Sequence, residues 1–481
     1  MLKNLIYLIT ISVYLIILIG IGLYKAGKIK TQADFAIAGR SLTPWVLVGT
    51  MLATWIGTGS ILGNAGKTYS TGMAALILPI GSVFGIFLLT KIAGKVRSYK
   101  KFTVPEIIGD RYGSTARILS VIALVMAYMV IVSYQYNAGG AVLHTILTDK
   151  TGTSLISLET ATIIAAIFII TYTMLAGLYS VAYTDVGNGI IMSISLLIAF
   201  PILWVKAGGM SGMEYAFQAM EKPDHMKFFG VYSFMDIINF CLPGFLLVLG
   251  DANMYQRFFA SRDEKGATQA TTILIAAVLL VELLIIATAW VSSSMIPDAE
   301  VGKHVLIYSA HRFLPPFVGA IMMTTIVGII ISTADSYLLV PATTLMRDIY
   351  QKHIDTRVNE KKIVLLSRML VLGLGIIAYF VSIGFSKSSG FFERALYAYT
   401  IYGAAITPAL VAALFWKNVS RAGAVLSISS GVVTTLVWKE VNFVQQLVPG
   451  YLYGNVDEVL PAISISILAL FFGSKFFPDK K

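Results

Sequence analysis

Charged side chains are scarce in this sequence. Asp, Glu, Lys and Arg make up only 13% of the 481 residues, whereas 57% of the residues are hydrophobic. Soluble domains carry about 25% charged residues, so the composition excludes an ordinary soluble protein. The single cysteine, Cys241, excludes an intramolecular disulfide. A mean hydropathy of +0.79 indicates an all-α polytopic membrane protein.

The motifs of soluble enzymes are also missing. A phosphate-binding loop requires a glycine five places before the glycine of "AGKT" (65–68), and Ile61 stands there instead. The five histidines show no paired spacing, which disfavours a metal centre. We also find no nucleophile beside a general base. The sequence therefore does not predict an enzyme.

Long apolar runs are abundant instead. A helix needs about 20 apolar residues to cross a hydrocarbon core of about 30 Å, and about thirteen segments meet that length. The first segment follows Lys3 and is longer than the apolar part of a secretory signal, so we expect it to remain a helix. The predicted spans are 5–24, 43–66, 72–94, 117–146, 158–177, 182–206, 233–258, 270–294, 314–349, 364–384, 392–416, 421–438 and 459–476.

The basic residues predict the orientation. About 25 of the 36 Lys and Arg residues lie on one side of the predicted spans, which the positive-inside rule assigns to the cytoplasm. An odd number of spans then places the N-terminus outside and the C-terminus inside a cell (plasma) membrane. Attraction to anionic lipid accounts for the net charge of +11, so we predict no nucleic-acid partner. The basic segments are 25–40, 95–117, 257–265, 347–368 and 475–481.

Two of the predicted spans, the second and the seventh, contain helix-breaking residues at matching places. A single glycine inside a membrane helix more often indicates close helix packing. Two interrupted helices that each open a five-helix unit instead indicate an inverted-repeat transporter, in which unwound backbone binds ions and solute. The interrupting residues are Gly57, Gly59 and Gly63 in the second span and Pro243, Gly244 and Gly250 in the seventh.

These breaks predict the organisation of the chain. Polar residues within the spans gather near one depth rather than along a continuous path, which favours a carrier over a channel. A membrane sensor on the same fold would be expected to add a cytoplasmic signalling domain, whereas we expect only a short tail after the last span. We expect an N-terminal helix and cytoplasmic loop (1–42), a first inverted repeat (43–206), an extracellular loop (207–232), a second inverted repeat (233–416), and two C-terminal helices with a short cytoplasmic tail (417–481).

Seven short motifs, in order along almost the whole chain, resemble the sodium/solute symporter family. That family includes carriers for proline, pantothenate, sugars, sialic acid and choline, and "GLYSVAYTDV" most resembles the choline branch. The resemblance implies a five-plus-five inverted repeat with one helix before it and two after it, and Na⁺ as the coupling ion. The motifs are "AGR" (38–40), "ATWIGTGS" (53–60), "VPEIIGDRYG" (104–113), "TMLAGLYSVAYTDVGNGI" (173–190), "MYQRF" (254–258), "STADSYLL" (332–339) and "RDIY" (347–350).

The resemblance also implies a main sodium site where the first broken helix meets "GIIISTADSYLL" (328–339). Na⁺ must exchange its hydration shell for about five or six oxygens, which a helix break and a hydroxyl-bearing helix supply jointly. Alternatively, these hydroxyls bond to their own helix, as they usually do in membrane helices. The matched break and the nearby acid Asp335 favour the ion site. The implied ligands are the carbonyls of Ala53, Ile56 and Ile329 and the hydroxyls of Ser332 and Thr333.

A second sodium site is implied beside the first. Some family members bind an additional sodium between an acid and hydroxyls that correspond here to Asp185, Asp335 and Ser336. Asp335 departs from the family pattern, because relatives with this site tend to carry a hydroxyl at its position. Two acids in one site favour a cation strongly, or else one of them holds a proton. Proton coupling therefore remains an alternative.

The predicted solute site flanks the same breaks. A carboxylate at Asp251 with Trp55 nearby suits an ammonium group through ion pairing and cation–π attraction, so we expect a small amine-bearing or cationic solute. Alternatively, Asp251 pairs with Arg257, and the solute is a carboxylate or a sugar. The sequence does not indicate an oligomeric state. The candidate residues are Trp55, Thr58 and Ser60 on the first broken helix, Tyr134 and Gln135 on the fourth span, and Asp251 and Tyr255 on the second broken helix.

Overall fold

The computed structural model describes residues 2–26, 29–148, 154–385, 390–441, 443–444 and 455–479. Among these residues the chain is helical, and strand-like pairing is confined to two isolated bridges, Leu42 with Ser261 and Thr148 with Ser154. The helices are α1 (Leu2–Ala26), α2 (Gln32–Ile37), η1 (Ala38–Arg40), α3 (Pro44–Trp55), η2 (Gly59–Asn64), α4 (Ala65–Thr71), η3 (Gly72–Ile77), α5 (Ile80–Leu89), α6 (Ala93–Ser98), α7 (Val104–Tyr112), α8 (Ser114–Ile146), α9 (Leu158–Lys206), α10 (Gly209–Ala219), η4 (Pro223–Met226), α11 (Phe234–Gly250), α12 (Ala252–Ala260), α13 (Glu264–Ser293), α14 (Ala299–Gly302), α15 (Val305–Arg312), α16 (Pro316–Thr344), η5 (Leu345–Ile354), α17 (Glu360–Phe385), α18 (Phe391–Phe415), α19 (Arg421–Glu440) and α21 (Val459–Phe476).

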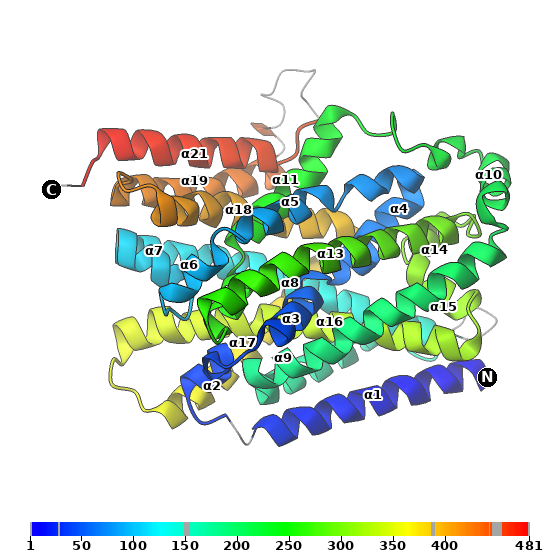
Figure 1. Cartoon of the computed structure of the whole chain (residues 1–481), viewed down its shortest axis with the longest axis horizontal. Helices are drawn as coiled ribbons and strands as arrows, with labels where there is room; N and C mark the ends of the chain where they lie inside the picture. Colours follow the sequence, from blue (N-terminus) through cyan, green and yellow to red (C-terminus); the bar gives the residue numbers. More distant parts are fainter. Residues whose placement is uncertain are drawn as a thin grey trace.

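The long helices run side by side along the longest axis of the molecule (Figure 1). In the described part of the chain, ten helices are long and apolar enough to cross a membrane, or eleven when the bent pair Pro44–Trp55 and Gly59–Ile77 counts as one span. The beginning of α1 and the end of α21 lie at opposite ends of the bundle (Figure 1). The chain therefore crosses the bundle an odd number of times overall.

The difference from about thirteen predicted spans has two local causes. The predicted spans 158–177 and 182–206 form one 49-residue helix, α9, which is interrupted at Gly177 (φ 58°, ψ 168°). At 1.5 Å per residue such a helix is about 74 Å long, more than twice a hydrocarbon core, so α9 contains two crossings joined at that kink. The predicted span 72–94 is divided among η3, α5 and α6, and α5 alone has only 10 residues.

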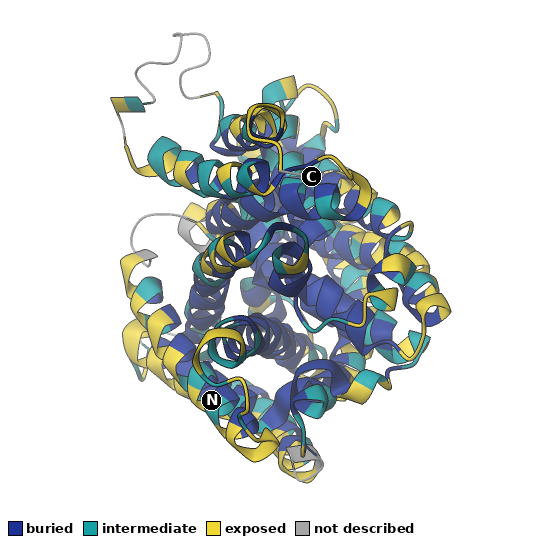
Figure 2. Cartoon of the chain, turned by 90° about the vertical axis from the view of Figure 1, so that its left-hand side faces the viewer, coloured by how far each residue is buried: buried dark blue, intermediate teal, exposed yellow. Residues whose placement is uncertain are grey.

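The helices differ sharply in burial. Of the most apolar window of α16, 78% is buried inside the protein, against 17% for α1. Exposed residues cover the outer faces of the peripheral helices, and buried residues fill the centre of the bundle (Figure 2). The polar stretch from Ser332 to Ser336 on α16 therefore faces protein rather than lipid, as expected for polar groups at membrane depth.

Two helix breaks lie inside this core. The axis bends by 49° between α3 and the helical stretch that begins at Gly59. The second break falls at Asp251 (φ −59°, ψ 114°), between α11 and α12. Pro243 and Gly244 lie within α11, so the break follows Gly250 alone among the predicted interrupting residues of that span. The predicted division into repeats, loop and C-terminal helices stays a prediction.

Candidate functional site

The break after α3 lies directly against α16. Ile56 leaves the helical conformation (φ −76°, ψ 88°), and the Ser332 hydroxyl oxygen lies 3.3 Å from the Ala53 carbonyl oxygen. A Cβ added at Gly57 would lie 2.9 Å from both Oγ1 and Cγ2 of Thr333. Glycine is thus required here, because no side chain fits between the break and α16.

The Thr333 hydroxyl has no hydrogen-bond partner among the described residues, although it is buried. A buried polar oxygen without a partner costs free energy, so this hydroxyl has an acceptor position available to a ligand at the helix break. Thr324, two turns earlier on α16, behaves differently, since its hydroxyl donates to the carbonyl of Ala320 in its own helix at 2.9 Å. Ile56 and Ile329 are buried, and the ion-binding roles of their carbonyls stay predictions.

Asp185 of α9 joins this cluster. Its Oδ1 accepts a hydrogen bond from the Ser332 hydroxyl at 2.5 Å, and its Oδ2 accepts one from Thr50 of α3 at 2.5 Å. The side chain is fully buried. The carboxylate therefore connects α3, α9 and α16 at the level of the first break.

Arg257 of α12 is the counter-ion of this carboxylate, and its role was not predicted. Its Nη2 lies 3.9 Å from Asp185 Oδ2 and donates to Ser336 Oγ at 2.6 Å and to Thr54 Oγ1 at 2.9 Å. Both charged side chains are fully buried. A buried guanidinium is costly unless it is paired and hydrogen-bonded, and these contacts meet that condition. Intramembrane arginine is the sequence signal that would have identified it.

Asp335 lies apart from the guanidinium. Its Oδ1 accepts a hydrogen bond from the hydroxyl of Thr173 on α9. No Lys, Arg or His nitrogen of the described residues forms an ion pair with this carboxyl group within 4.0 Å. Of the three residues predicted for a second sodium, Asp185 and Ser336 thus both interact with Arg257. The carboxyl group of Asp335 instead accepts a hydrogen bond from the Thr173 hydroxyl.

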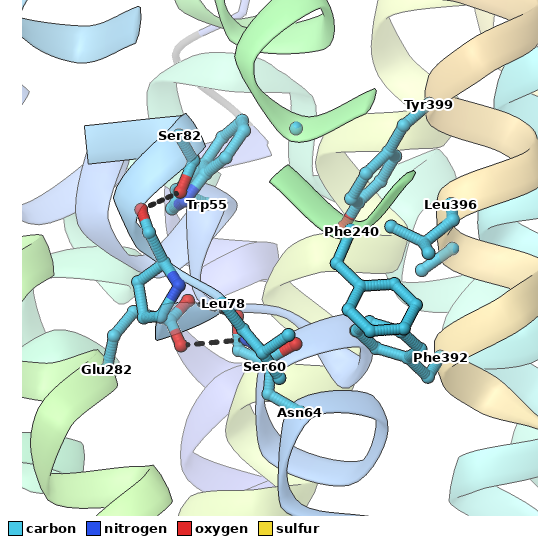
Figure 3. Close-up of a pocket in the computed structure, with 14 residues that line it drawn as sticks. Trp55, Ser60, Asn64, Leu78, Ser82, Phe240, Glu282, Phe392, Leu396 and Tyr399 are labelled. Carbon is cyan, nitrogen blue, oxygen red and sulfur yellow. Dashed lines mark hydrogen bonds between the residues drawn. The ribbon is translucent and has the colours of Figure 1, made fainter. Parts of the chain in front are cut away.

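A small internal cavity adjoins the same break (Figure 3). Its volume is about 40 Å³, which is room for a few ordered waters or for one small polar group of a larger ligand. The rings of Trp55 and Tyr399 stack beside it with centroids 6.5 Å apart. A Cβ at Gly59 would lie 2.8 Å from the Tyr399 hydroxyl, so this glycine allows α18 to approach the break. The main lining residues are Trp55, Ser60, Asn64, Phe240, Glu282, Phe392 and Tyr399.

Glu282 of α13 is the acid of this cavity, and sequence reasoning missed it. Its Oε1 accepts from Ser60 at 2.5 Å and its Oε2 accepts from Asn64 at 3.1 Å, and Figure 3 shows Glu282 and Ser60 pointing toward one another. Only 2% of the residue is exposed. The signal was a single carboxylate inside the apolar run 273–290, which in a membrane protein indicates function.

The remaining predicted solute residues lie outside the lining of this cavity. The Thr58 hydroxyl donates to Gln135 of α8, and Tyr134 is buried beside it on the same helix. Tyr255 donates to the Leu249 carbonyl at 3.0 Å. These contacts hold the two helix breaks in place.

Asp251 also lies outside that lining. Its Oδ1 accepts from the Tyr128 hydroxyl at 2.5 Å and from the backbone N–H of Asn253 at 3.3 Å. Its Oδ2 has no hydrogen-bond partner among the described residues. Arg257 makes its ion pair within 4.0 Å with Asp185 and not with Asp251.

A larger cavity of about 820 Å³ lies toward the end of the bundle that carries α14 and the beginning of α1 (Figure 1). The two cavities share Phe392 in their linings, so they adjoin each other at this ring. Its lining contains three basic side chains and one acidic side chain, namely Lys67, Lys303, Arg394 and Glu393. We call this larger cavity the vestibule.

Buried oxygens at a helix break, inside a bundle of membrane helices, define a secondary transporter. The chain belongs to the sodium:solute symporter family, whose model matches residues 35–431. It is 25% identical over 484 residues to the sodium/proline symporter of Staphylococcus aureus (strain JH9), covering 97% of this chain and 92% of that one. The family predicted from the sequence, and Na⁺ as its coupling ion, are confirmed.

Solved structures confirm the fold. A Na⁺-coupled sialic acid symporter in a substrate-bound, outward-open state aligns with a TM-score of 0.81 at 16% identity, over 99% of this chain and 98% of its own. Mhp1, a nucleobase-cation-symport-1 family transporter in a closed conformation, aligns with a TM-score of 0.59 at 14% identity, over 93% of this chain and 96% of its own. The all-α inverted-repeat fold expected from the sequence is therefore the fold of this protein.

Proposed function

We propose that this protein imports a small amine-bearing or cationic solute together with sodium, by alternating access. The single observation that carries the proposal is the unwound backbone at Ile56 and Gly57 against the unpaired Thr333 hydroxyl and Ser332. Na⁺ takes five or six oxygens, about the number that this junction supplies. The ligands are the carbonyls of Ala53, Ile56 and Ile329 with the hydroxyls of Ser332 and Thr333.

Sodium at this junction joins α3 to α16. Because Trp55 and Ser60 flank the same break and line the small cavity, a bound ion fixes the shape of the solute site. Sodium and solute then raise each other's affinity by the same factor. Moving each sodium inward through 100 mV releases about 2.3 kcal/mol, which drives import of the solute against its gradient.

The orientation follows from the basic segments. The ends of the helices near residues 25–40 and 95–117 lie in the cytoplasm of the cell, so the N-terminus is outside and the C-terminus is inside. The vestibule then faces the outside, since it lies at the end that carries the beginning of α1. A solute passes from the vestibule past Phe392 to the small cavity.

A second coupled cation is proposed at Asp335. Arg257 already neutralises Asp185 and contacts Ser336, so Asp335 is the carboxyl group of this region that still lacks a counter-ion. Sodium is the first candidate for that place, with Asp185 and Ser336 at its edge. A proton on Asp335 is the alternative, and it is favoured by the single hydroxyl contact from Thr173.

Uptake into proteoliposomes tests the main sodium site. A thermal-shift panel of amines, amino acids, sugars and carboxylates, with NaCl or KCl, first identifies a stabilising solute. We expect Ser332→Ala and Thr333→Ala each to raise the sodium concentration for half-maximal uptake at least tenfold. Thr324→Ala is the matched control, because this hydroxyl bonds its own helix. An unchanged sodium response in both site variants would contradict the proposal.

A further inference from the structure

We propose that Glu282 binds the protonated amine of the solute, in the cavity lined by Trp55 and Tyr399. This inference rests on the proposed function and deepens it, because it assigns the charged group of the solute to one side chain. Nothing in the sequence motifs selected this residue.

The charge of Glu282 is uncompensated. In the described part of the chain, no Lys, Arg or His nitrogen pairs with it within 4.0 Å, and the side chain is 98% buried, since only 2% is exposed. Asp185 differs in that it is paired with Arg257. An isolated buried carboxylate is strongly unfavourable unless a cation joins it.

The hydrogen bonds of Glu282 leave acceptor capacity for such a cation. Ser60 donates to Oε1 and Asn64 donates to Oε2, whereas an ionised carboxylate offers about four lone-pair positions. The two donors also fix the carboxylate plane, so an incoming N–H finds a preorganised acceptor. Charge-assisted hydrogen bonds of this kind are shorter and stronger than neutral ones.

The aromatic lining suits the alkyl part and the charge of an ammonium ion. Trp55 and Tyr399 stack in the lining of the cavity, and the rings of Phe240 and Phe392, also in the lining, meet edge to face with centroids 5.4 Å apart. The faces of such rings attract cations, most strongly when water is excluded. Carboxylate and rings therefore select the same class of ligand.

The position of the two donors links the amine to sodium. Ser60 and Asn64 both belong to η2, which begins two residues after Gly57 of the sodium junction. Sodium that orders this break also orders the two groups that hold Glu282. The affinity for the amine should therefore depend on sodium.

Asp251 is the less suitable acid. Its Oδ2 also has no hydrogen-bond partner among the described residues, but its side chain does not line the cavity. Glu282 takes the role that the sequence predicted for Asp251, at the first break instead of the second.

The vestibule's excess of basic residues favours an amine that also carries a carboxylate over a simple cation. A simple amine and an amine with a carboxylate share the ammonium group, and the binding experiment below distinguishes these two solute classes.

Binding to purified full-length protein tests the assignment. The probes are n-propylamine, proline and glycine betaine at neutral pH, each titrated in NaCl and in KCl by thermal shift. The variants are Glu282→Gln, Glu282→Asp and, as a control on the same helix, Glu264→Gln, whose side chain is exposed. Titration with NaCl alone reports the sodium site separately.

We expect at least one N–H probe to bind in a sodium-dependent manner, with Glu282→Gln weakening it by about 10- to 100-fold. Glu282→Asp should retain most of the affinity, and Glu264→Gln should match wild type. Binding of n-propylamine would identify a simple amine, and binding of proline a zwitterion. Glycine betaine, which lacks an N–H, should bind more weakly than either.

Two outcomes would overturn the assignment. Wild-type affinity for the bound amine in Glu282→Gln, with its sodium response intact, would exclude Glu282 as the amine site and leave the symporter proposal standing. The absence of any sodium-dependent amine binding in wild type would remove the amine class altogether. A sodium response without amine binding would distinguish this failure from a failure of the sodium site.

Discussion

The guanidinium of Arg257 lies 3.9 Å from the carboxylate of Asp185, and neither residue is exposed. The two charges come from α12 and α9, and both helices pack against α3 and α16. Since Arg257 also donates to Thr54 and Ser336, one guanidinium joins four helices. A fixed positive charge therefore adjoins the proposed site of the coupling ion.

The pair should be strongly coupled in stability. Arg257→Met leaves Asp185 as an unpaired buried charge, which typically costs about 3–5 kcal/mol. We expect Arg257→Met/Asp185→Asn to be less destabilised than the sum of the two single variants. Thermal unfolding of the four proteins in detergent forms the double-mutant cycle. Additive effects would show that the ion pair contributes no coupling.

Gly57→Ala should abolish the sodium response. The added methyl group would lie 2.9 Å from the Thr333 hydroxyl, so either the break or α16 must move away from the ion. Gly373→Ala on α17 is the control, because nothing lies within 4 Å of its Cβ. Where the methyl group fits, replacing glycine with alanine stabilises a helix by up to about 1 kcal/mol. Stabilisation by sodium, measured as a thermal shift, should survive only in the control.

The sodium dependence of uptake should be cooperative. If Asp335 holds a second sodium, initial rates rise with a Hill coefficient above one, and Asp335→Asn lowers that coefficient to one. Initial uptake rates at several pH values and constant sodium distinguish a bound proton from a bound sodium. If Asp335 carries a proton, uptake by wild type depends on pH, and Asp335→Asn loses that dependence. A Hill coefficient of one in wild type, Asp335→Asn and Asp185→Asn would contradict a second sodium.

The stability of the segment around η4 should fall in mild acid. Burial lowers the pKa of His225 below 6.5, and its Nε2 lies 3.0 Å from the Tyr69 carbonyl. The unfolded chain takes up a proton near pH 6.5 and the folded chain does so only at lower pH, so stability decreases as the pH drops below about 6.5. We expect the melting temperature of wild type to fall more between pH 7.5 and 5.5 than that of His225→Gln. Equal falls would exclude this histidine as the cause.

The sequence predicted the parts of the molecule that depend on local chemistry. Glycine at Gly57 and hydroxyls at Ser332 and Thr333 break the apolar pattern of their own segments, and the structure brings them together. The sequence predicts a gap between two spans where the structure has a kink at Gly177. The reason is that a glycine with positive φ and a short loop give similar sequence patterns.

Other features depend on partners distant in the chain. Pro243 remains inside α11, since the neighbouring helices hold its shape, and the backbone departs from helix only at Asp251. Glu282 is separated by 222 positions from Ser60, its hydrogen-bond donor. Periodicity and motif order give no information on which distant side chain meets an isolated acid, so Glu282 and Arg257 could be recognised as unusual but not assigned.

The supports of Glu282 have a consequence for how such carriers diversify. Its carboxylate comes from α13, whereas the proposed ion ligands lie where α3 meets α16, and Ser60 and Asn64 of η2 donate hydrogen bonds to the carboxylate. A substitution at one position of α13 would therefore change which solute is bound while the residues proposed to bind sodium stay the same. New solute specificities would then arise without any change in ion coupling.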